Sequence, residues 1–295
     1  MGPARDNVFA VVVTYHPDAT AIARLGSLAT QFANVIVVDN DSGQETLTAL
    51  RNEAGECRNV VLINNPKNAG VAAALNQGCR RAADEGANWV AMFDQDSAPA
   101  GDFLNALADQ WALQPERDRI GLVGVNFRKP SGNMLIQEGT GLAEARAVIT
   151  SGSLLKMAAW RDVGAFREDF FIDEVDHEWA LRARRRGWQI KIARRVLMEH
   201  TIGSPRQHSV LGWRPMVSHH SALRRYYMVR NRLLMAQEHF RFDPLFVGQQ
   251  LARSLGESAS ILLFEPDKTA KLRAMAAGFI DGVRGKTGRS VRATR

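Results

Sequence analysis

Short apolar runs alternate with amphipathic stretches along the first half of the chain. Four runs rich in β-branched residues have the length of buried strands, and they lie at residues 8–15, 34–40, 59–65 and 88–96. The stretches that follow them have helical spacing and predict helices at about residues 19–32, 44–54 and 70–85, with a fourth beginning near Pro99. This alternation is typical of a mainly parallel sheet covered by helices on both faces.

After residue 120 the pattern changes and shorter elements are predicted. They are strands at 120–127 and 147–157, a helix from about Asp173 to Arg186 closed by Gly187 as its C-cap, and further short strands within 188–200. After about Pro215 the spacing is helical and ends in a basic tail. We therefore predict an α/β domain over residues 1–215 and a helical region over residues 216–295.

Polar residues follow each of the first four predicted strands. They are Thr14-Tyr15, Asp39 to Ser42, Asn65 to Gly70, and Asp94 to Asp96. Asn, Asp, Ser and Gly are ordinary turn residues, which is the structural explanation for this pattern. In sheets of this kind, however, ligands gather at the carboxyl ends of the strands. Four polar ends on one edge therefore favour a binding cleft there.

Asp94 and Asp96 stand directly after the fourth apolar run, with one residue between them. On a strand, side chains at i and i+2 point to the same side, which would bring the two carboxylates together. Two such charges about 4 Å apart repel by roughly 4 kcal/mol at an effective dielectric near 20. Mg²⁺ and Mn²⁺ prefer oxygen ligands and would remove that repulsion, so the pair predicts a metal–phosphate site. The alternative is that Asp96 or Ser97 caps a helix whose first turn contains Pro99.

A second group of acids crowds the start of the helix predicted from Asp173. Its members are Asp173, Glu174, Asp176 and Glu178. Acids favour the positive end of a helix dipole, which is the structural explanation. The apolar stripe of this helix is predicted to be Val175, Trp179 and Ala183. Asp176 lies beside that stripe with Asp173 three positions before it, and a carboxylate near a sugar hydroxyl can act as a general base.

Composition and charge narrow the class of protein. Apolar residues make up 45% of the chain, which suffices for a packed core, and the formal charge is +7. A basic surface suits nucleic acid, anionic lipid or phosphorylated ligands, or it is simply a solvated face. Acids at the strand ends argue against nucleic acid because they would repel its backbone. The two cysteines, Cys57 and Cys79, form no CxxC pair, which argues against a disulfide scaffold or a thiolate zinc site.

Several signals that would place the chain elsewhere are missing from the sequence. There is no GxxxxGK[ST] phosphate loop and no GxGxxG after the first strand. No basic-then-apolar signal segment opens the sequence, and no uninterrupted apolar run reaches about 18 residues. We therefore expect a cytoplasmic protein, with a place at the inner face of the membrane as the alternative.

Seven segments, in this order, resemble family-2 glycosyltransferases of the GT-A fold. They are VVVTYHPD, VIVVDNDS, NPKNAGVAAALNQG, FDQDS, TSGSLL, FIDEVDHEWALRARRRGW and MEHTIG. The DQDS form and the later HHSALRRYYMVRNRL look most like bacterial rhamnosyltransferases, and the resemblance spans about residues 7–235. It implies a Rossmann-like mixed, mainly parallel sheet flanked by helices, with a C-terminal helical extension. It also implies an inverting transfer of sugar from a nucleotide-diphosphate donor, dTDP-L-rhamnose being favoured, to a glycan or lipid-linked acceptor hydroxyl.

The resemblance also implies roles for individual residues. Those expected to bind the donor nucleotide are Thr14, Tyr15, Asp39, Asn68, Gly70, Asn76 and Asp94. A divalent cation, Mg²⁺ or Mn²⁺, is expected on Asp96, Asp94 and His200, although a lone histidine is more often structural. Asp176 matches the catalytic base, and Val175 stands where many relatives have a second acid. Trp179, Arg182 and Asp173 are expected to shape the acceptor pocket.

Alternatives to this reading remain open at this point. A related enzyme could use a UDP-hexose or galactofuranose donor. A sugar-phosphate nucleotidyltransferase would share the parallel sheet and metal-binding aspartates, but its early glycine- and basic-rich signature is absent. A basic binding module without catalysis is the third alternative. The apolar and basic C-terminal segments can contact an anionic membrane surface, or they pack on the catalytic domain or on a second subunit of a homo-oligomer.

Overall fold

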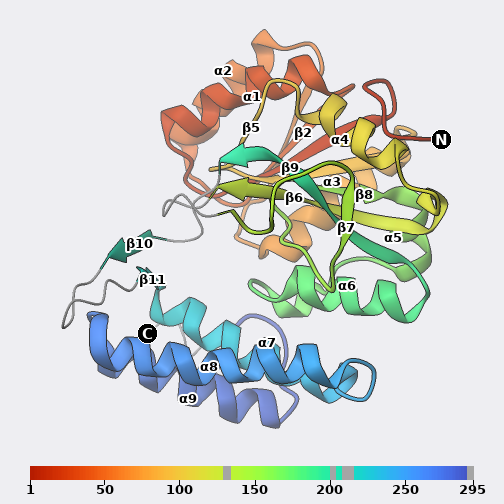
Figure 1. Cartoon of the computed structure of the whole chain (residues 1–295). Helices are drawn as coiled ribbons and strands as arrows, with labels where there is room; N and C mark the ends of the chain where they lie inside the picture. Colours follow the sequence, from red (N-terminus) through yellow and green to blue (C-terminus); the bar gives the residue numbers. More distant parts are fainter. Residues whose placement is uncertain (129–133, 200–203, 208–215, 291–295) are drawn as a thin grey trace. The chain divides into compact units, whose positions relative to one another are not determined.

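The computed structural model describes residues 1–128, 134–199, 204–207 and 216–290, and the chain forms two compact units (Figure 1). Unit 1 comprises Met1–Phe166 and Trp179–His200, and unit 2 comprises Arg167–Glu178 and Thr201–Arg295. The division therefore does not follow chain order, because a short central segment belongs to unit 2. The predicted domain boundary at residues 215–216 adjoins a segment outside the described residues and stays a prediction.

Unit 1 is built around one mixed sheet. Its strands are β1 (Val8–Thr14), β2 (Val35–Asp39), β3 (Val60–Asn64), β4 (Trp89–Asp94), β5 (Ala98–Pro99), β6 (Ile120–Arg128), β7 (Leu142–Glu144), β8 (Ser153–Lys156) and β9 (Gln189–Glu199). The order is β3-β2-β1-β4-β8-β6-β9-β5, with β7 paired to β9. The first four strands in that order are parallel, and β8 joins them antiparallel. The predicted mixed α/β sheet is therefore confirmed, with its parallel pairs concentrated in the first half.

Helices cover both faces of this sheet. They are α1 (Ala19–Gln31), α2 (Gln44–Glu56), α3 (Val71–Asp84), α4 (Phe103–Ala112), α5 (Met157–Val163), the short helix η1 (Arg117–Arg119), and all but the first turn of α6 (Val175–Arg185). Figure 1 shows α1, α2 and α4 on one side of the sheet and α3 on the other. A Cβ at Gly78 of α3 would lie 2.3 Å from Cγ1 of Val11, so this glycine permits the helix to lie close on β1. Burial on both faces explains why the strands are apolar throughout.

The predicted start of the fourth helix near Pro99 is wrong. Ala98 and Pro99 instead form β5, which pairs antiparallel with the end of β9. Helix α4 begins four residues later at Phe103, with Asp102 in the N-cap position. Proline has no backbone N–H to donate, and an edge strand tolerates it because one side of that strand has no partner strand.

Three further predictions differ from the structure in their bounds. The helix expected from Asp173 begins at Val175, because Asp173 and Glu174 have φ of +64° and +62°, outside the α-helical region. Gly187 follows the helix with φ +86°, as its predicted capping role requires. Within 147–157 only the residues of β8 form a strand, and 188–200 holds the single long strand β9. The predicted core stripe of this helix is confirmed by the burial of Val175, Trp179 and Ala183.

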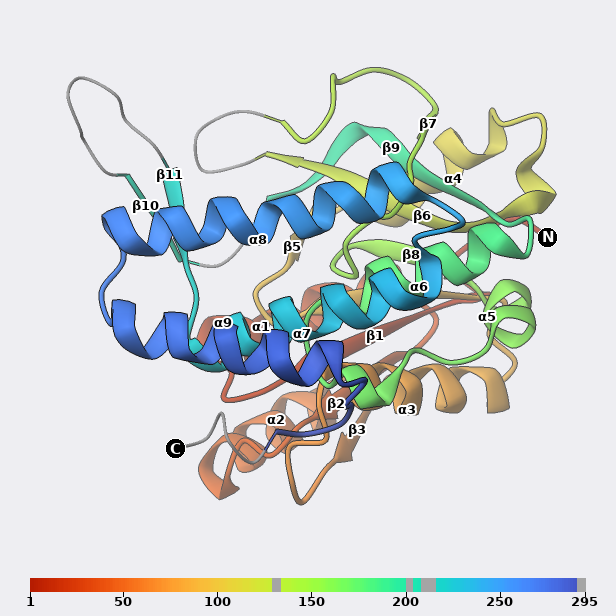
Figure 2. The ribbon, with the colours of Figure 1, turned by 90° about the horizontal axis from the view of Figure 1, so that it is seen from below.

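Unit 2 is a layer of long helices with a small hairpin and a short inserted segment. Its elements are the short helix η2 (Glu168–Phe170), the first turn of α6, β10 (Ser204–Gln207), β11 (Met216–His219), α7 (Ala222–His239), α8 (Pro244–Phe264) and α9 (Lys268–Val283). Figure 2 shows α7, α8 and α9 together, so the predicted C-terminal helical extension is confirmed from Ala222 onward, whereas Met216–His219 form the strand β11 and not a helix. Asp243 caps α8 by accepting from the Phe246 N–H at 3.1 Å. None of the helices among the described residues is long and apolar enough to cross a membrane.

Candidate functional site

We call the loops that follow β1, β2, β3 and β4 in unit 1 the strand-end edge. Asp39, the last residue of β2, is fully buried there. Its carboxylate accepts hydrogen bonds from the Thr14 hydroxyl at 2.9 Å, the Ser42 hydroxyl at 2.5 Å and the Ser42 N–H at 3.1 Å. These bonds join the ends of β1 and β2 and fix the predicted nucleotide-binding pair Thr14 and Asp39 beside each other.

A chain of asparagine amides extends this edge toward α3. The Asn40 amide donates to Oδ1 of Asn68 at 3.1 Å, and Oδ1 of Asn40 accepts from the Asn65 amide at 3.2 Å and the Ala69 N–H at 2.9 Å. Oδ1 of Asn68 also accepts from the N–H of Gly70 at 2.9 Å. Gly70 has φ +89° and precedes the first turn of α3. The predicted pair Asn68 and Gly70 therefore lies in one hydrogen-bonded loop, whose partner Asn40 had no role assigned from the sequence.

Asp94 and Asp96 lie at this edge, but not as successive positions of a strand. Asp94 ends β4 and is partly buried, whereas Asp96 is exposed in the following turn, which the Ser97 N–H closes onto the Asp94 carbonyl at 3.1 Å. The strand-based argument for their common side is therefore wrong. The capping alternative is also wrong, because the next helix begins only at Phe103.

Tyr15 and Gln95 connect the ends of β1 and β4. The Tyr15 N–H donates to Oε1 of Gln95 at 2.7 Å. The Tyr15 ring is 49% exposed and contacts the His16 ring edge to face, with centroids 4.4 Å apart. An exposed ring on this polar edge offers an aromatic surface for a flat ligand. Gln95 was missed from the sequence, although it stands between the two aspartates that drew attention.

Residues Asn76, Trp179 and Arg182 of unit 1 all hold the same loop. Asn76 is fully buried and exchanges two hydrogen bonds with the Phe166 backbone, at 2.8 and 2.9 Å. The indole N–H of Trp179 and the guanidinium of Arg182 donate to backbone carbonyls within residues 163–165. These contacts give each side chain a structural task, and the donor role of Asn76 and the acceptor roles of Trp179 and Arg182 stay predictions.

The metal prediction included His200, which lies outside the described residues. In the part of the chain that the structure describes, one group of three acidic or histidine side chains offers ligand atoms within 4.8 Å of one another, namely Glu178, Glu238 and His239 of unit 2. It shares no residue with the predicted metal set. The Arg167 guanidinium already pairs with the Glu238 carboxylate at 2.5 Å.

In unit 2 the backbone before Asp176 is strained. Phe171, Asp173 and Glu174 all have positive φ, between 62° and 66°. Such a conformation costs a non-glycine residue on the order of 1–3 kcal/mol and persists only where the surroundings enforce it. Residues with such backbone strain cluster at functional sites, which agrees with the prediction that this segment carries the general base Asp176.

Asn231 of α7 holds that strained segment. Its amide nitrogen lies 2.8 to 3.0 Å from the carbonyl oxygens of Phe170, Ile172 and Asp173, and its Oδ1 accepts from the Arg230 guanidinium. The side chain is fully buried. One amide therefore satisfies carbonyls that the irregular backbone leaves without helical partners. The sequence analysis assigned no role to Arg230 or Asn231, because the residues that they contact lie about 60 positions earlier in the chain.

The residues around Asp176 form a charged network. The Arg232 guanidinium pairs with Glu174 at 2.7 Å and with Glu257 at 2.8 Å, and Glu174 contacts Nδ1 of His177 at 2.7 Å. Asp176 lies in the first turn of α6, and its carboxylate accepts a hydrogen bond from the backbone N–H of His177 at 2.8 Å. Burial alone would favour a neutral ring, but the carboxylates of Asp176 and Glu174 raise the pKa of His177 to about 9.

Asp173 lies in the same segment. The Arg224 guanidinium binds its carboxylate with two contacts, at 2.5 and 3.2 Å. Burial raises the pKa of Asp173 in spite of that arginine. Its expected part in an acceptor pocket stays a prediction.

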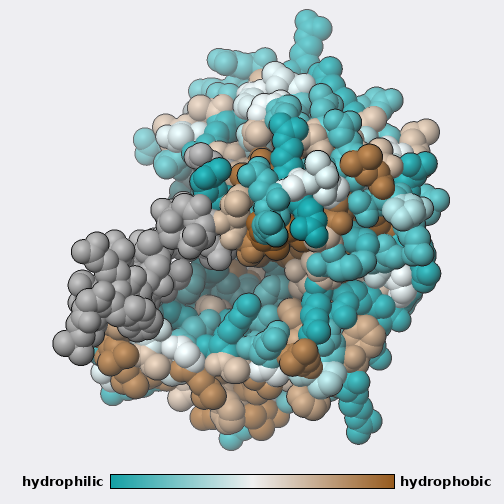
Figure 3. Space-filling model, viewed as in Figure 1, coloured by the Kyte–Doolittle hydropathy of each residue, from teal (hydrophilic) through white to brown (hydrophobic). Residues whose placement is uncertain are grey.

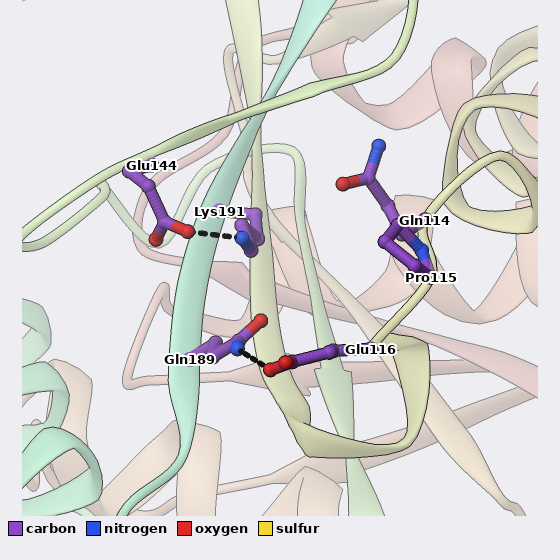
Figure 4. Close-up of a pocket in the computed structure, with 6 residues that line it drawn as sticks. All are labelled: Gln114, Pro115, Glu116, Glu144, Gln189 and Lys191. Atoms are coloured by element: carbon purple, nitrogen blue, oxygen red, sulfur yellow. Dashed lines mark hydrogen bonds and ion pairs between the residues drawn. The ribbon is translucent and has the colours of Figure 1, made fainter.

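A shallow hollow of about 260 Å³ lies beside the first residues of β9, at the end of the strand away from its pairing with β5 (Figure 4). Its lining residues are Gln114, Pro115, Glu116, Glu144, Gln189 and Lys191. Figure 4 shows Lys191 paired with Glu144, and Gln189 donating to Glu116 at 2.8 Å. None of the predicted site residues lines it, so the strand-end edge of unit 1 and the Asp176 segment of unit 2 remain the two candidate regions.

Replacing Asn231 by Ala should lower the unfolding free energy by about 2–4 kcal/mol, because the carbonyls of Ile172 and Asp173 lose this donor and the Arg230 guanidinium loses its Oδ1 acceptor. Gln237 on the same helix is the matched control, since it is exposed and donates once, to the Gly282 carbonyl at 3.0 Å. Gln237→Ala should cost less than about 1 kcal/mol. Urea unfolding of the full chain measures both, and equal losses would contradict the clamp.

The raised pKa of His177 predicts a pH-dependent stability. Because the folded pKa of about 9 lies above the ordinary 6.5, the contribution is complete below pH 6.5 and is lost as pH rises through 9. The full difference of about 2.5 pKa units corresponds to roughly 3 to 4 kcal/mol. Thermal midpoints of the wild type should therefore fall across this window, and His177→Gln should flatten the fall. The exposed His16→Gln should leave the profile unchanged, and a wild-type profile that is flat from pH 6 to 9 would refute the assignment.

Comparisons with known proteins show which proteins this chain is similar to. The family described as glycosyl transferase family 2 matches residues 10–147. A protein of Shigella flexneri named dTDP-rhamnosyl transferase RfbF is 29% identical over 296 residues, covering 96% of this chain and 97% of that protein.

Solved structures show that the fold is that of glycosyltransferases. S. aureus TarS 1-349 in complex with UDP is 17% identical with a TM-score of 0.61, covering 94% of this chain and 81% of that one. The mannosyltransferase PcManGT from Pyrobaculum calidifontis, solved with GDP-Man and Mn²⁺, is 17% identical with a TM-score of 0.59, covering 96% and 90%. Residues 10–147 therefore match the family 2 glycosyltransferase model, the chain has the GT-A fold of the solved glycosyltransferases, and these findings together support a glycosyltransferase.

Proposed function

We propose that this glycosyltransferase is an inverting enzyme that transfers L-rhamnose from dTDP-L-rhamnose to a hydroxyl of a glycan or lipid-linked acceptor. The observation that carries the donor is the likeness, over nearly the full length of both chains, to a protein named for dTDP-rhamnosyl transfer. An enzyme with another donor, a UDP-hexose or galactofuranose nucleotide, is the rival outcome of the test below.

The strand-end edge is the proposed donor site. Asp39 offers carboxylate oxygens that can accept a ring N–H of the nucleobase, and the exposed Tyr15 ring offers a surface on which the base can lie. The loop of Asn68 and Gly70 brings amide and backbone groups to the same edge, suited to ribose and diphosphate oxygens. The arrangement fits the general rule that open α/β sheets bind ligands at the carboxyl ends of their strands.

Asp94 and Asp96 are the proposed metal ligands. Their donor atoms are carboxylate oxygens, the partly buried Asp94 ends β4 and the exposed Asp96 follows in the turn, so the chemistry of the pair fits a hard divalent cation. Such a cation, when bound, supplies positive charge for the diphosphate that leaves. The mannosyltransferase of similar fold was solved with Mn²⁺, which supports this class of ion. His200 as a third ligand is part of the same proposal.

Asp176 is the proposed general base. Its carboxylate takes the proton of the acceptor hydroxyl while that oxygen bonds to the anomeric carbon and the bond from carbon to the diphosphate oxygen breaks. One displacement inverts the anomeric centre and needs no enzyme nucleophile. The strained, clamped backbone before Asp176 supports this role, because it fixes the position of the first turn of α6. Asp173, Trp179 and Arg182 are proposed to shape the acceptor pocket.

A donor panel combined with Asp176→Asn tests the proposal. Release of nucleoside diphosphate should be fastest with dTDP-rhamnose among dTDP-, UDP- and GDP-sugars. Asp176→Asn should lower transfer by roughly 10²- to 10⁴-fold, the usual contribution of general-base catalysis, while dTDP-rhamnose still binds. Asp109→Asn, an exposed aspartate of α4, should leave both unchanged. Full turnover by Asp176→Asn would remove the base, and preference for a UDP-sugar would remove the donor.

The metal role has a separate test in Asp96→Ala. Calorimetric titration with dTDP should show binding that strengthens when Mn²⁺ is added to the wild type. We expect the variant to lose that gain by about tenfold or more, because one of few oxygen ligands is gone. Asp109→Ala serves as the matched control. An unchanged response to Mn²⁺ in Asp96→Ala would contradict the assignment.

A further inference from the structure

The exposed face of α8 is largely apolar, with the exposed Gln249 as a polar interruption near its start. Its large side chains are Leu245, Leu255, Leu262 and Leu263, which are 59%, 75%, 54% and 67% exposed. Small exposed residues fill the positions between them, and we call the whole set the α8 stripe: Leu245, Ala252, Leu255, Gly256, Ala259, Leu262 and Leu263. Leu245 lies two helical turns before Ala252, and the residues from Ala252 to Leu263 recur at helical spacing, which places the set on one face. At 1.5 Å per residue the stripe runs for about 27 Å.

The core of unit 2 does not require this stripe. The opposite side of α8 already carries the buried apolar residues Phe246, Val247 and Ile261, and Ile261 packs with Val229 and Met275 of the neighbouring helices. Helix α8 is therefore apolar on both its inner and its outer face. Scattered exposed leucines need no explanation, but an extended apolar face marks a contact with something else.

The acids of this region point inward. Asp243, Glu265 and Asp281 are all buried. Glu265 pairs with Arg225 at 2.6 Å and with Lys271 at 2.8 Å, so its charge is neutralised inside the unit. Asp243 is used as the cap of α8. The negative charges of α8 and α9 are thus largely withdrawn from the surface.

Most bases of α8 and α9 point outward, the exception being the buried Lys271. The exposed ones are Arg253, Lys268 and Arg273, with the exposed Arg284 directly after α9. Among the described residues no ion pair involves Lys268, Arg273 or Arg284. Further apolar side chains, Phe279, Ile280 and Val283, are exposed on α9. The outer surface of these two helices is therefore apolar and positively charged, and Figure 3 shows brown and pale-brown spheres gathered where they lie.

We propose that the α8 stripe and its neighbouring basic residues bind the surface of an anionic phospholipid bilayer. Helix α8 lies in the plane of the interface with its leucines in the boundary between head groups and acyl chains, and the arginines and lysine meet the anionic head groups. An interfacial helix of this kind does not need the length or uniform apolarity of a spanning one. The proposal does not depend on the identity of the donor sugar.

Charge favours a bilayer over a second copy of the chain as the occupant. In the described part of α7, α8 and α9 the exposed acids are Glu238 and Asp267, and Glu238 already pairs with Arg167. Two copies meeting through this face would bring like positive charges together with little negative charge to match them. Anionic head groups supply the missing complement.

Flotation of the purified full chain with vesicles tests the proposal. One vesicle contains phosphatidylcholine alone, and the other contains about 30% phosphatidylglycerol. We expect the protein to float with the anionic vesicles and hardly with the neutral ones. Binding should weaken when salt rises from about 0.1 M to about 1 M, because the Debye length falls to about 3 Å. Equal recovery with both vesicles, or with neither, would overturn the proposal.

Paired variants separate the apolar and the charged contributions. Leu255→Ser with Leu263→Ser should weaken vesicle binding by about tenfold or more, since two leucines no longer leave water. Leu113→Ser with Leu135→Ser, exposed leucines of unit 1, should have no effect. Lys268→Glu with Arg273→Glu should abolish the preference for anionic vesicles. The equal charge change Arg51→Glu with Arg58→Glu in unit 1 is its control.

The stripe variants alter only exposed side chains, so unchanged thermal midpoints should accompany their loss of binding. The oligomeric state of the wild type, measured by sedimentation without lipid, decides between a bilayer and a second copy of the chain as the occupant of the stripe. A dimer that forms without lipid and dissociates in Leu255→Ser with Leu263→Ser would assign the stripe to a second copy and overturn the proposal.

Discussion

Parallel pairing of β3, β2, β1 and β4 is the constraint on which the candidate donor site depends. The register sets Thr14 opposite Asp39 and Asp39 opposite Asn64, and it sets Val13 opposite Asp94. Because β1, β2 and β4 are buried on both faces, polar side chains can be tolerated in them only where the strands end. Residues separated by 25 to 80 positions in the sequence therefore share one edge, and the hydrogen bonds among Thr14, Asp39 and the asparagines follow from that register.

Unit 2 depends on a different constraint, which is that buried charges must find partners. Arg230, Asn231 and Arg232 follow one another on α7 and all are buried. Each would be costly without a partner, and each is satisfied by the segment that precedes α6. The same contacts enforce the positive φ values of that segment. The start of α6, and with it Asp176, is therefore positioned by side chains from a helix far along the chain.

The sequence predicted the repeating parts of the fold well because they depend on local pattern. Strands β1 to β4 and helices α1 to α3 agree with the predictions to within about two residues. The failures lie where a long-range contact decides. Ala98 and Pro99 form a strand because β9 passes beside them, and Asp173 and Glu174 leave the helix because α7 holds their backbone. Local propensity carries no information about either partner.

The same distinction applies to the candidate site. The polar strand ends could be found from the sequence, because each follows an apolar run. Gln95, Asn40 and Asn231 could not, since their importance lies in bonds to distant backbone groups. Conversely, Asn76, Trp179 and Arg182 drew attention through resemblance, and the structure gives each of them a loop to hold. A residue that characterises a family can therefore serve its architecture as readily as its chemistry.

The proposed donor site and the proposed general base lie in different segments of this chain. The segment that matches the family, residues 10–147, contains the strand-end edge and both aspartates of the proposed metal site. Asp176 lies beyond it, in the segment of unit 2 where the backbone is strained and the arginines of α7 converge. Loss of the base assignment would leave the donor edge untouched, because no residue is common to the two. The strain supports Asp176 on physical grounds alone, since a protein retains a costly backbone only where something is gained from its position.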